Sequence, residues 1–135
     1  MEGFLTRLHP TAHALMRIMV GFAYWTHGAG KLFAWFGADG TVELMSRWGA
    51  AGVIETVFGA AIILGFKTRY AAFIASGEMA VAYFWIHSLR GESLWHWANR
   101  GELVLVYCFV FLYLATAGSG PWSVDAMLEK KQDAG

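Results

Sequence analysis

Long apolar stretches separated by short polar ones dominate the hydropathy pattern of this chain. A helix needs about 20 mainly apolar residues to cross a membrane core roughly 30 Å thick. Four stretches approach that length, with approximate bounds at residues 14–36, 48–66, 70–86 and 101–118. We therefore expect an all-α integral membrane protein that folds as a four-helix bundle.

The connections between these stretches indicate how the helices follow one another. The residues Lys67 to Arg69 ("KTR") leave room only for a tight turn, so the second and third stretches are expected to form an antiparallel hairpin. The other connections, 37–49 and 87–101, are longer, but neither is long enough to divide the chain. Residues 1–135 are expected to form a single domain.

Composition agrees with a membrane protein. Hydrophobic residues make up 57% of the chain and charged residues 15%, and the mean hydropathy is +0.44, which is too apolar for an ordinary soluble domain. Ten basic residues balance ten acidic ones, so there is no basic surplus to indicate nucleic acid binding. The single cysteine, Cys108, excludes an intramolecular disulfide and any CxxC motif. The N-terminus lacks a signal-peptide pattern and is expected to be mature sequence.

Basic residues near the ends of the spans predict the orientation. With four spans, both termini and the Lys67–Arg69 turn lie on one side of the membrane. That side carries more basic residues, namely Arg7, Arg17, Lys67, Arg69, Lys130 and Lys131, against Arg47, Arg90 and Arg100 on the other. We expect both termini to be cytoplasmic.

A polar stripe runs along the first span. At 100° per residue, its members fall within about a third of the helix circumference; they are Arg17, Gly21, Tyr24, His27, Gly28 and Lys31. Such a stripe is expected to face protein and not lipid. The predicted topology places His27, Lys31 and Glu55 in the outer half of the bilayer and Glu78 near its midplane.

Charged groups at these depths allow two interpretations. An ionised side chain at the bilayer centre costs about 2.5–3.5 kcal/mol on insertion scales, so such groups pair, become neutral or line a wet cavity. They could form internal ion pairs that only hold the helices together. Alternatively, His27, Lys31, Glu55 and Glu78 could line a polar pocket. There, His27 and Lys31 would donate hydrogen bonds, and Glu55 or Glu78 would relay protons. We expect Lys31 to meet Glu55, with Gly28 admitting the neighbouring helix.

Other polar residues are expected to have structural roles. Asn99 and Glu102 have the spacing of a helix capping box, in which Asn99 caps the first turn and Glu102 reaches back. Arg17 and Asp125 both fall at the cytoplasmic face. An ion pair between them would fasten the C-terminal segment to the first span.

The histidines and the cysteine give no clear cofactor site. His9 and His13 are four residues apart, but Pro10 disfavours a regular helix there and no third ligand is near, so no metal site is expected. His87 and His96 flank an outer loop. Either could ligate a haem, although packing or hydrogen bonding is the favoured interpretation. Cys108 is interpreted as a small buried apolar residue, and no covalently bound cofactor is expected.

Three segments resemble the DoxX family of small membrane proteins. "MRIMVGFAYWTHGAGKLFAWFG" is similar to its opening span, which carries an HG-x-x-K-L-F element. "IETVFGAAIILGFKTRYAA" resembles its second and third spans, with an early glutamate and G-x-x-T-R at the turn. "NRGELVLVYCFVFLYLATAGSGPWSVDAML" resembles its closing block. The resemblance covers about residues 12 to 128.

The resemblance implies a four-helix membrane bundle in a bacterial or archaeal plasma membrane. Founding members of the family form the small membrane subunit of a thiosulfate:quinone oxidoreductase. Others are linked to thiol or oxidative stress and to quinone-related detoxification, and distant cousins act as cargo receptors or assembly chaperones. The positions that match the family pattern are Arg17, Gly21, His27, Gly28, Lys31, Glu55, Arg69, Asn99, Glu102, Ser123 and Asp125. Glu78 lies outside the matched elements.

Three functional hypotheses follow. The leading one is a membrane subunit of a respiratory or redox complex that binds quinone or anchors an oxidoreductase partner. The lack of a cysteine pair or cofactor motif argues against catalysis by this chain alone. The alternative is a non-catalytic structural or assembly subunit whose buried charges only hold the bundle together. A third hypothesis, a small transporter or cargo receptor, would require oligomerisation. The expected partners are lipid and either further subunits or copies of this chain.

Overall fold

The computed structural model describes residues 1–89 and 93–134, and it is mainly helical, with no strand in those ranges. In chain order the elements are α1 (Glu2–Phe33), α2 (Arg47–Leu64), α3 (Thr68–Ala82), the π-helical segment η1 (Tyr83–Ser88), α4 (His96–Asn99), α5 (Glu102–Ala117) and α6 (Val124–Asp133). The all-α class predicted from the sequence is confirmed for this part of the chain. Arg90, one of the basic residues used to orient the chain, lies outside the described ranges.

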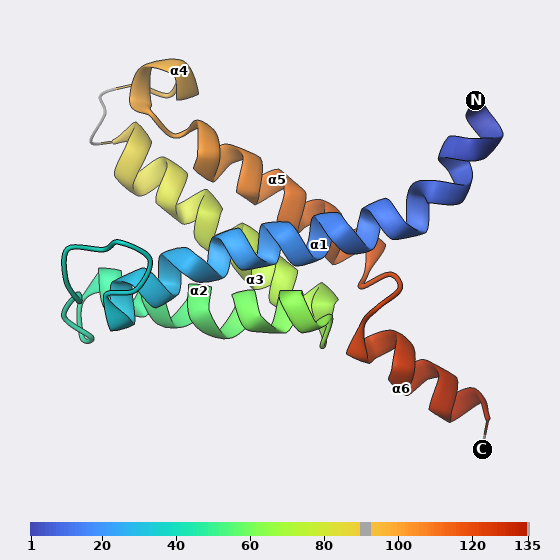
Figure 1. The fold of residues 1–135 in the computed structure, drawn as a ribbon. Helices are drawn as coiled ribbons and strands as arrows, with labels where there is room; N and C mark the ends of the chain where they lie inside the picture. The colour runs from blue at the N-terminus through green and yellow to red at the C-terminus, as the bar shows by residue number, and fades with distance from the viewer. Residues whose placement is uncertain (90–92, 135) are drawn as a thin grey trace.

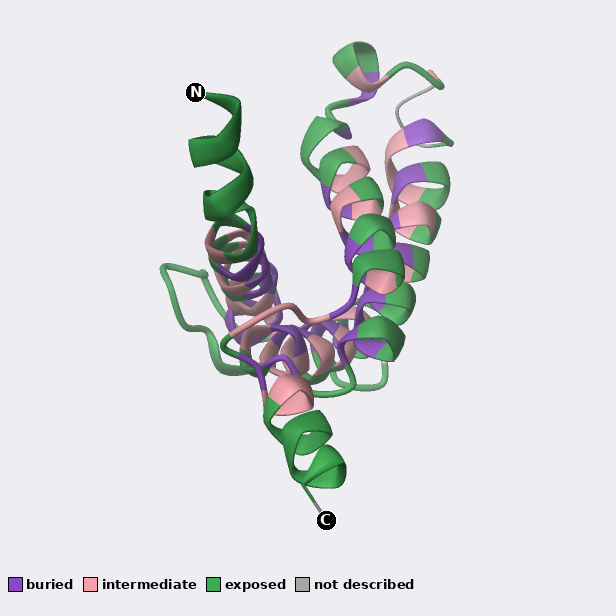
Figure 2. Ribbon diagram, turned by 90° about the vertical axis from the view of Figure 1, so that its right-hand side faces the viewer, coloured by how far each residue is buried: buried purple, intermediate pink, exposed green. Residues whose placement is uncertain are grey.

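The four longest helices pack as two pairs (Figure 1). α1 lies along α2, α3 lies along α5, and α3 follows α2 through a tight turn. Figure 2 shows the two pairs as arms that diverge. Both termini lie at one end of the molecule, and α4 and the loop 34–46 lie at the other (Figure 1). A single four-helix bundle with cytoplasmic termini stays a prediction.

The first helix differs from expectation at both ends. It ends at Phe33 because Ala34 adopts a left-handed φ of 53° and donates its N–H to the Gly30 carbonyl. It begins at Glu2 and runs through Pro10, so the predicted loss of regular helix at Pro10 is wrong. A proline inside a helix removes one hydrogen bond and bends the helix without necessarily ending it. Figure 1 shows α1 bending toward its N-terminus.

The turn between α2 and α3 is as tight as predicted. α2 ends at Leu64, and Gly65 has a φ of 68°, a left-handed conformation that favours glycine. The Phe66 N–H donates to the Ala61 carbonyl and closes the last turn. A side chain at position 65 would also collide with Ser123, since its Cβ would lie 2.3 Å from the Ser123 Cβ. Position 65 therefore requires glycine for two independent reasons.

Length and composition single out one helix among the described elements. α2 is long and apolar enough to cross a membrane, and α5 is apolar but has only 16 residues. α3 has only 15 residues, because its α-helical hydrogen bonding ends at Ala82. The helical path nevertheless continues through η1 to Ser88.

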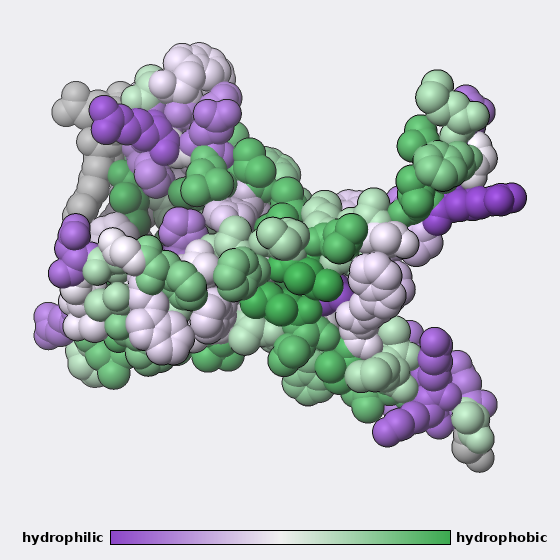
Figure 3. Space-filling view, viewed as in Figure 1, coloured by the Kyte–Doolittle hydropathy of each residue, from purple (hydrophilic) through white to green (hydrophobic). Residues whose placement is uncertain are grey.

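Buried residues lie between the helices of each pair and where the pairs meet (Figure 2). The core of small and aromatic residues includes Tyr24, Ile62, Ala75 and Phe111. Large apolar side chains point outward instead. Phe73, for example, is 65% exposed, and Figure 3 shows apolar residues over the middle of one face and hydrophilic ones mainly toward its two ends. Apolar surface of this extent marks contact with lipid or another protein.

The predicted ion pair between Arg17 and Asp125 does not form. The buried Arg17 guanidinium donates to five backbone carbonyls, those of Ile62, Ile63, Ser119, Pro121 and Trp122. The Asp125 carboxylate accepts from the Lys67 and Thr68 N–H groups at the start of α3, at 2.7 and 3.0 Å. Both residues fasten the C-terminal segment. They do so by binding backbone groups, many of them left free at helix ends, and not by binding each other.

The predicted capping box of Asn99 and Glu102 is also wrong. α5 begins only at Glu102, because Arg100 has a left-handed φ of 58° and interrupts the helical path. The buried Asn99 side chain accepts from the Gly101 N–H at 2.8 Å and donates to the Ser93 carbonyl at 3.1 Å. Asn99 thus holds the turn between α4 and α5, while Glu102 is an exposed residue in the first turn of α5.

Candidate functional site

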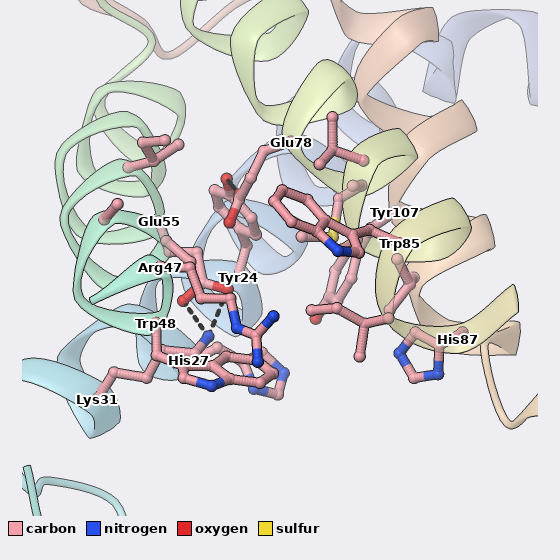
Figure 4. A pocket seen from close by; sticks show the side chains of 18 of the residues that line it. Tyr24, His27, Lys31, Arg47, Trp48, Glu55, Glu78, Trp85, His87 and Tyr107 are labelled. Carbon is pink, nitrogen blue, oxygen red and sulfur yellow. Dashed lines mark hydrogen bonds and ion pairs between the residues drawn. The ribbon is translucent and has the colours of Figure 1, made fainter. Parts of the chain in front are cut away.

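A cavity of about 450 Å³ lies between the two helix pairs, at the end of the molecule away from the termini. The walls come from α1, α2, α3, η1 and α5, and most of the lining surface is apolar. All four residues predicted for a polar pocket, His27, Lys31, Glu55 and Glu78, line it (Figure 4). The fold thus brings together residues that are far apart in the sequence.

Lys31 and Glu55 join α1 to α2 at the edge of this cavity. The Lys31 Nζ lies 2.6 Å from Oε1 and 2.5 Å from Oε2 of Glu55, and the Glu55 side chain is only 6% exposed. The predicted contact between the two is confirmed. An ammonium group has three N–H donors. Two of them are directed at Glu55, and the third remains for a further acceptor.

Gly28 makes this close approach possible, as predicted. A Cβ on Gly28 would lie 2.6 Å from the Thr56 backbone nitrogen and 2.8 Å from the Glu55 Cβ. Any side chain at position 28 would therefore push α2 away from α1. The glycine sets the spacing at which the Lys31 ammonium reaches the Glu55 carboxylate.

Glu78 reaches the cavity from α3 and has a partner of its own. The Tyr24 hydroxyl donates a hydrogen bond to Oε2 of Glu78 and so links α1 to α3. Tyr24 is 1% exposed and packs edge-on against Phe111 of α5, with 4.8 Å between ring centroids. One tyrosine thus connects three helices at the floor of the cavity.

His27 occupies a different environment from the two carboxylates. The side chain is exposed to the cavity and lies edge-on to the Tyr107 ring, at 6.2 Å between centroids. No hydrogen bond links its ring nitrogens to another residue in the described part of the chain. Of the four predicted pocket residues, His27 is the one without a hydrogen-bond partner among the described residues.

Several lining residues were not predicted as part of the site. Arg47 and Trp48 start α2, with the guanidinium 5.6 Å from the Trp48 ring centroid. Trp85 and His87 come from η1, and Tyr107 comes from α5. Tyr24 was part of the predicted polar stripe on the first span. Trp85 and His87 were missed because the apolar periodicity of the third span does not indicate that this span ends in a π-helix.

The remaining predicted polar residues lie elsewhere. Arg17 and Asp125 stabilise the opposite end of the molecule, and Asn99 organises the turn before α5. The His13 Nε2 lies 3.0 Å from the Gly118 carbonyl oxygen, so this histidine is part of the same end. Cys108 is half-buried in α5 and lies beside the Ser76 hydroxyl.

Comparison with known proteins places the chain in a family. The DoxX family model matches residues 12–88, which is more than half of the sequence and includes all four predicted pocket residues. The chain belongs to the DoxX family. The DoxX match ends before Asn99, so the similarity of the closing block to the family stays a prediction.

Individual relatives of this DoxX protein are bacterial. An uncharacterised protein of Haemophilus influenzae is 38% identical over 135 residues, covering 94% of this chain and 98% of the relative. The Escherichia coli protein named inner membrane protein YqjF is 31% identical over 137 residues, covering 94% of this chain and 99% of the relative. No solved structure matches this DoxX chain.

Proposed function

We propose that this DoxX-family protein is an integral membrane subunit of a bacterial respiratory or redox complex, and that its cavity binds a quinone. The observation that carries the proposal is one mainly apolar cavity with His27, Lys31, Glu55 and Glu78 on its walls. Pockets for small ligands have volumes of about 300–1,000 Å³ and combine apolar walls with a few placed polar groups. A quinone ring with its two carbonyls fits this description.

Several findings support a membrane location. The surface exposes large apolar side chains on all of the long helices, and α2 is long and apolar enough to span a bilayer. A relative that aligns over nearly the full length is named an inner membrane protein. On this basis we place the four long helices across the plasma membrane, both termini in the cytoplasm and the cavity in the outer half.

The polar wall of the cavity suits a ligand carbonyl. Lys31 has one N–H not directed at Glu55, and the free His27 ring lies four residues before it on the same helix. Both would donate hydrogen bonds to a carbonyl oxygen and stabilise negative charge that develops there. Pairing with Glu55 keeps the ammonium in place in an apolar environment.

Proton transfer would use the two carboxylates. Reduction of a quinone to a quinol takes up two electrons, which a partner subunit would supply, together with two protons. Glu55 lines the cavity beside Lys31, and Glu78 accepts a hydrogen bond from the Tyr24 hydroxyl. Each carboxylate would take up a proton from the outer side and then pass it to a ligand oxygen.

The test compares variants that remove the donors without leaving a buried charge. His27→Ala removes one donor, and Lys31→Met combined with Glu55→Leu removes the ion pair as a unit. In nanodiscs, binding of decylubiquinone is followed through quenching of tryptophan fluorescence. Loss of a hydrogen bond from a charged donor costs about 1.5–3 kcal/mol. The Lys31→Met, Glu55→Leu variant is therefore expected to bind at least about tenfold more weakly.

The matched control for His27→Ala is His9→Ala, which removes an exposed histidine of the same helix far from the cavity. Its binding should equal that of the wild type. If the triple variant His27→Ala, Lys31→Met, Glu55→Leu inserts, keeps its helical content and still binds the quinone as tightly as wild type, the pocket assignment is wrong.

One observation favours the non-catalytic alternative. Both carboxylates of the cavity already have protein partners, Lys31 for Glu55 and Tyr24 for Glu78, which suits charges that only hold helices together. If the protein is a structural subunit, replacing the Lys31–Glu55 pair should disrupt its complex and should not change quinone binding. Size-exclusion analysis of the complex in mild detergent, beside the binding assay, separates the two functions.

A further inference from the structure

His87 lines the cavity on the wall formed by η1, across from His27 in the view of Figure 4. The proposed quinone mechanism does not use this residue, and the other polar groups considered there come from α1, α2 and α3. His87 is thus a titratable group of unassigned role inside the same cavity.

The π-helical backbone explains how His87 comes to line the cavity. Within η1, the Leu89 N–H donates to the Phe84 carbonyl five residues earlier, at 3.1 Å. Three consecutive residues, Trp85, Ile86 and His87, all line the cavity. In an α-helix three such residues would spread over more than half of the circumference. Single π turns occur frequently at functional sites.

A hydrogen bond selects the tautomer of the neutral His87 ring. The Nδ1 atom lies 3.1 Å from the Asn99 carbonyl oxygen. Because a carbonyl oxygen can only accept, Nδ1 must carry the hydrogen. In the neutral ring Nε2 is then an acceptor. Among the described residues, Nε2 has no hydrogen-bond partner.

The surroundings hold this arrangement in place. The Asn99 side chain is bonded to Gly101 and Ser93, so its own backbone carbonyl is fixed. The Tyr83 hydroxyl donates to the Leu94 carbonyl at 2.6 Å and ties the start of η1 to the same turn. The acceptor at His87 is therefore preorganised, which reduces the entropy cost of binding a ligand.

We infer that His87 is a ligand-binding residue whose Nε2 accepts a hydrogen bond from a ligand hydroxyl, so that the cavity selects a lipid-soluble hydroxyaromatic compound such as a quinol. The inference rests on the proposed quinone site and extends it. Donors lie on the α1 wall and an acceptor lies on the η1 wall. His87 Nε2 therefore favours the reduced ligand, because a quinol hydroxyl can donate a hydrogen bond to it and a quinone carbonyl cannot.

The test measures two redox forms against two variants. Decylubiquinol, kept reduced under argon, and decylubiquinone are titrated into nanodiscs that hold wild type, His87→Phe or His87→Gln. His87→Phe should weaken quinol binding about fivefold, as expected for one neutral hydrogen bond, and change quinone binding less than twofold. His87→Gln keeps an acceptor oxygen and should restore most of the preference. His96→Phe, outside the cavity, is the control.

A measurement without any variant covers the case in which His87→Phe does not fold. Wild type is titrated with the quinol and with its dimethyl ether, which lacks both hydroxyl hydrogens, and the ether should bind more weakly. Equal binding of quinol and ether, or equal loss of both redox forms in His87→Phe, overturns this inference while the quinone site stands. If wild type binds neither redox form, both the inference and the proposed function fail.

Discussion

At the level of single residues, the polar groups of α1 differ between its two ends. Arg17 is fully buried and is satisfied by backbone carbonyls, whereas Lys31 is paired with Glu55 at the edge of a cavity. Each of the three guanidinium nitrogens of Arg17 donates to at least one of these carbonyls. Lys31 and His27 still have donor capacity. Ligand chemistry on α1 is therefore expected only at the cavity end.

We predict that Arg17→Met lowers the free energy of unfolding by about 3–5 kcal/mol, because it breaks several charge-assisted hydrogen bonds and leaves buried carbonyls without donors. Arg17→Lys should recover only part of this loss, since an ammonium has three donors and lacks the planar fork of the guanidinium. The measurement is unfolding by sodium dodecyl sulfate in mixed micelles.

Arg7→Met is the control for Arg17→Met, because Arg7 lies on the exposed N-terminal part of the same helix. It should change stability by less than about 0.5 kcal/mol. Full recovery by Arg17→Lys would mean that charge alone, and not the set of five carbonyl bonds, holds this end together.

The sequence allowed one of these residue contacts to be predicted and not the other. Lys31 and Glu55 are opposite charges at one expected depth, and Gly28 marks the close approach between their helices. The partners of Arg17 are carbonyls of Ile62, Ile63, Ser119, Pro121 and Trp122. Every residue has a carbonyl, so side-chain identity carries no signal for such a contact.

At the level of elements, glycines set the contact between α1 and α2. Gly28 faces Thr56, and Gly59 of α2 faces Trp25, with 2.9 Å between the Trp25 Cα and a Cβ built on the glycine. The reciprocal placement brings the two backbones together along much of their length. Small residues have this role in many membrane helix pairs.

We predict that Gly28→Ala destabilises the protein by about 1–3 kcal/mol, the cost of overpacking a tight interface. It should also weaken the Lys31–Glu55 contact, because α2 must move away from α1. Stability in micelles and decylubiquinone binding are both expected to fall.

Gly77→Ala provides the matched control within the same protein. A Cβ at Gly77, in the middle of α3, meets nothing within 4 Å. Alanine favours a helix over glycine by about 1 kcal/mol, so Gly77→Ala should be neutral or stabilising. Equal gains in stability at positions 28 and 77 would mean that helix propensity, and not the α1–α2 spacing, governs both sites.

The elements themselves were predictable to different degrees. The hairpin through Gly65 followed from a short polar turn between two apolar runs. The helix through Pro10 and the π-helical end of α3 did not follow. In both cases the backbone departs from the regular α-helical hydrogen-bond pattern that hydrophobic periodicity assumes. The expected cap of α5 was also displaced, because the left-handed φ of Arg100 interrupts the helix before Glu102.

At the level of the whole molecule, the two helix pairs are joined by the short α2–α3 turn and by Tyr24, whose hydroxyl and ring reach α3 and α5. The cavity lies where the pairs diverge. The shape of the site therefore depends on the angle between the pairs, which no local sequence pattern specifies.

The proposed topology predicts a labelling pattern. In a Cys108→Ala background, Asp39→Cys should react with an impermeant maleimide added to intact spheroplasts, because the loop 34–46 is expected outside. Lys67→Cys and Lys131→Cys should react only after lysis, since the turn and the C-terminus are expected in the cytoplasm. All three positions are exposed in the structure, so accessibility depends on the side of the membrane.

Labelling of Lys131→Cys in intact spheroplasts would reverse the orientation, and labelling of Asp39→Cys and Lys67→Cys from the same side would contradict four spans. The unmodified Cys108→Ala protein sets the background signal. The cavity would open to the cytoplasm in the first case, and protons for the carboxylates would come from that side.

The carbonyl cage of Arg17 also affects how the protein is made. Its acceptors at residues 119–122 are synthesised about a hundred residues after the arginine itself. In the proposed topology the first helix enters the bilayer before these carbonyls exist, so the guanidinium lacks part of its set of acceptors until the last part of the chain is made. We therefore predict that chains truncated before residue 119 fold incompletely and are degraded faster than the full chain.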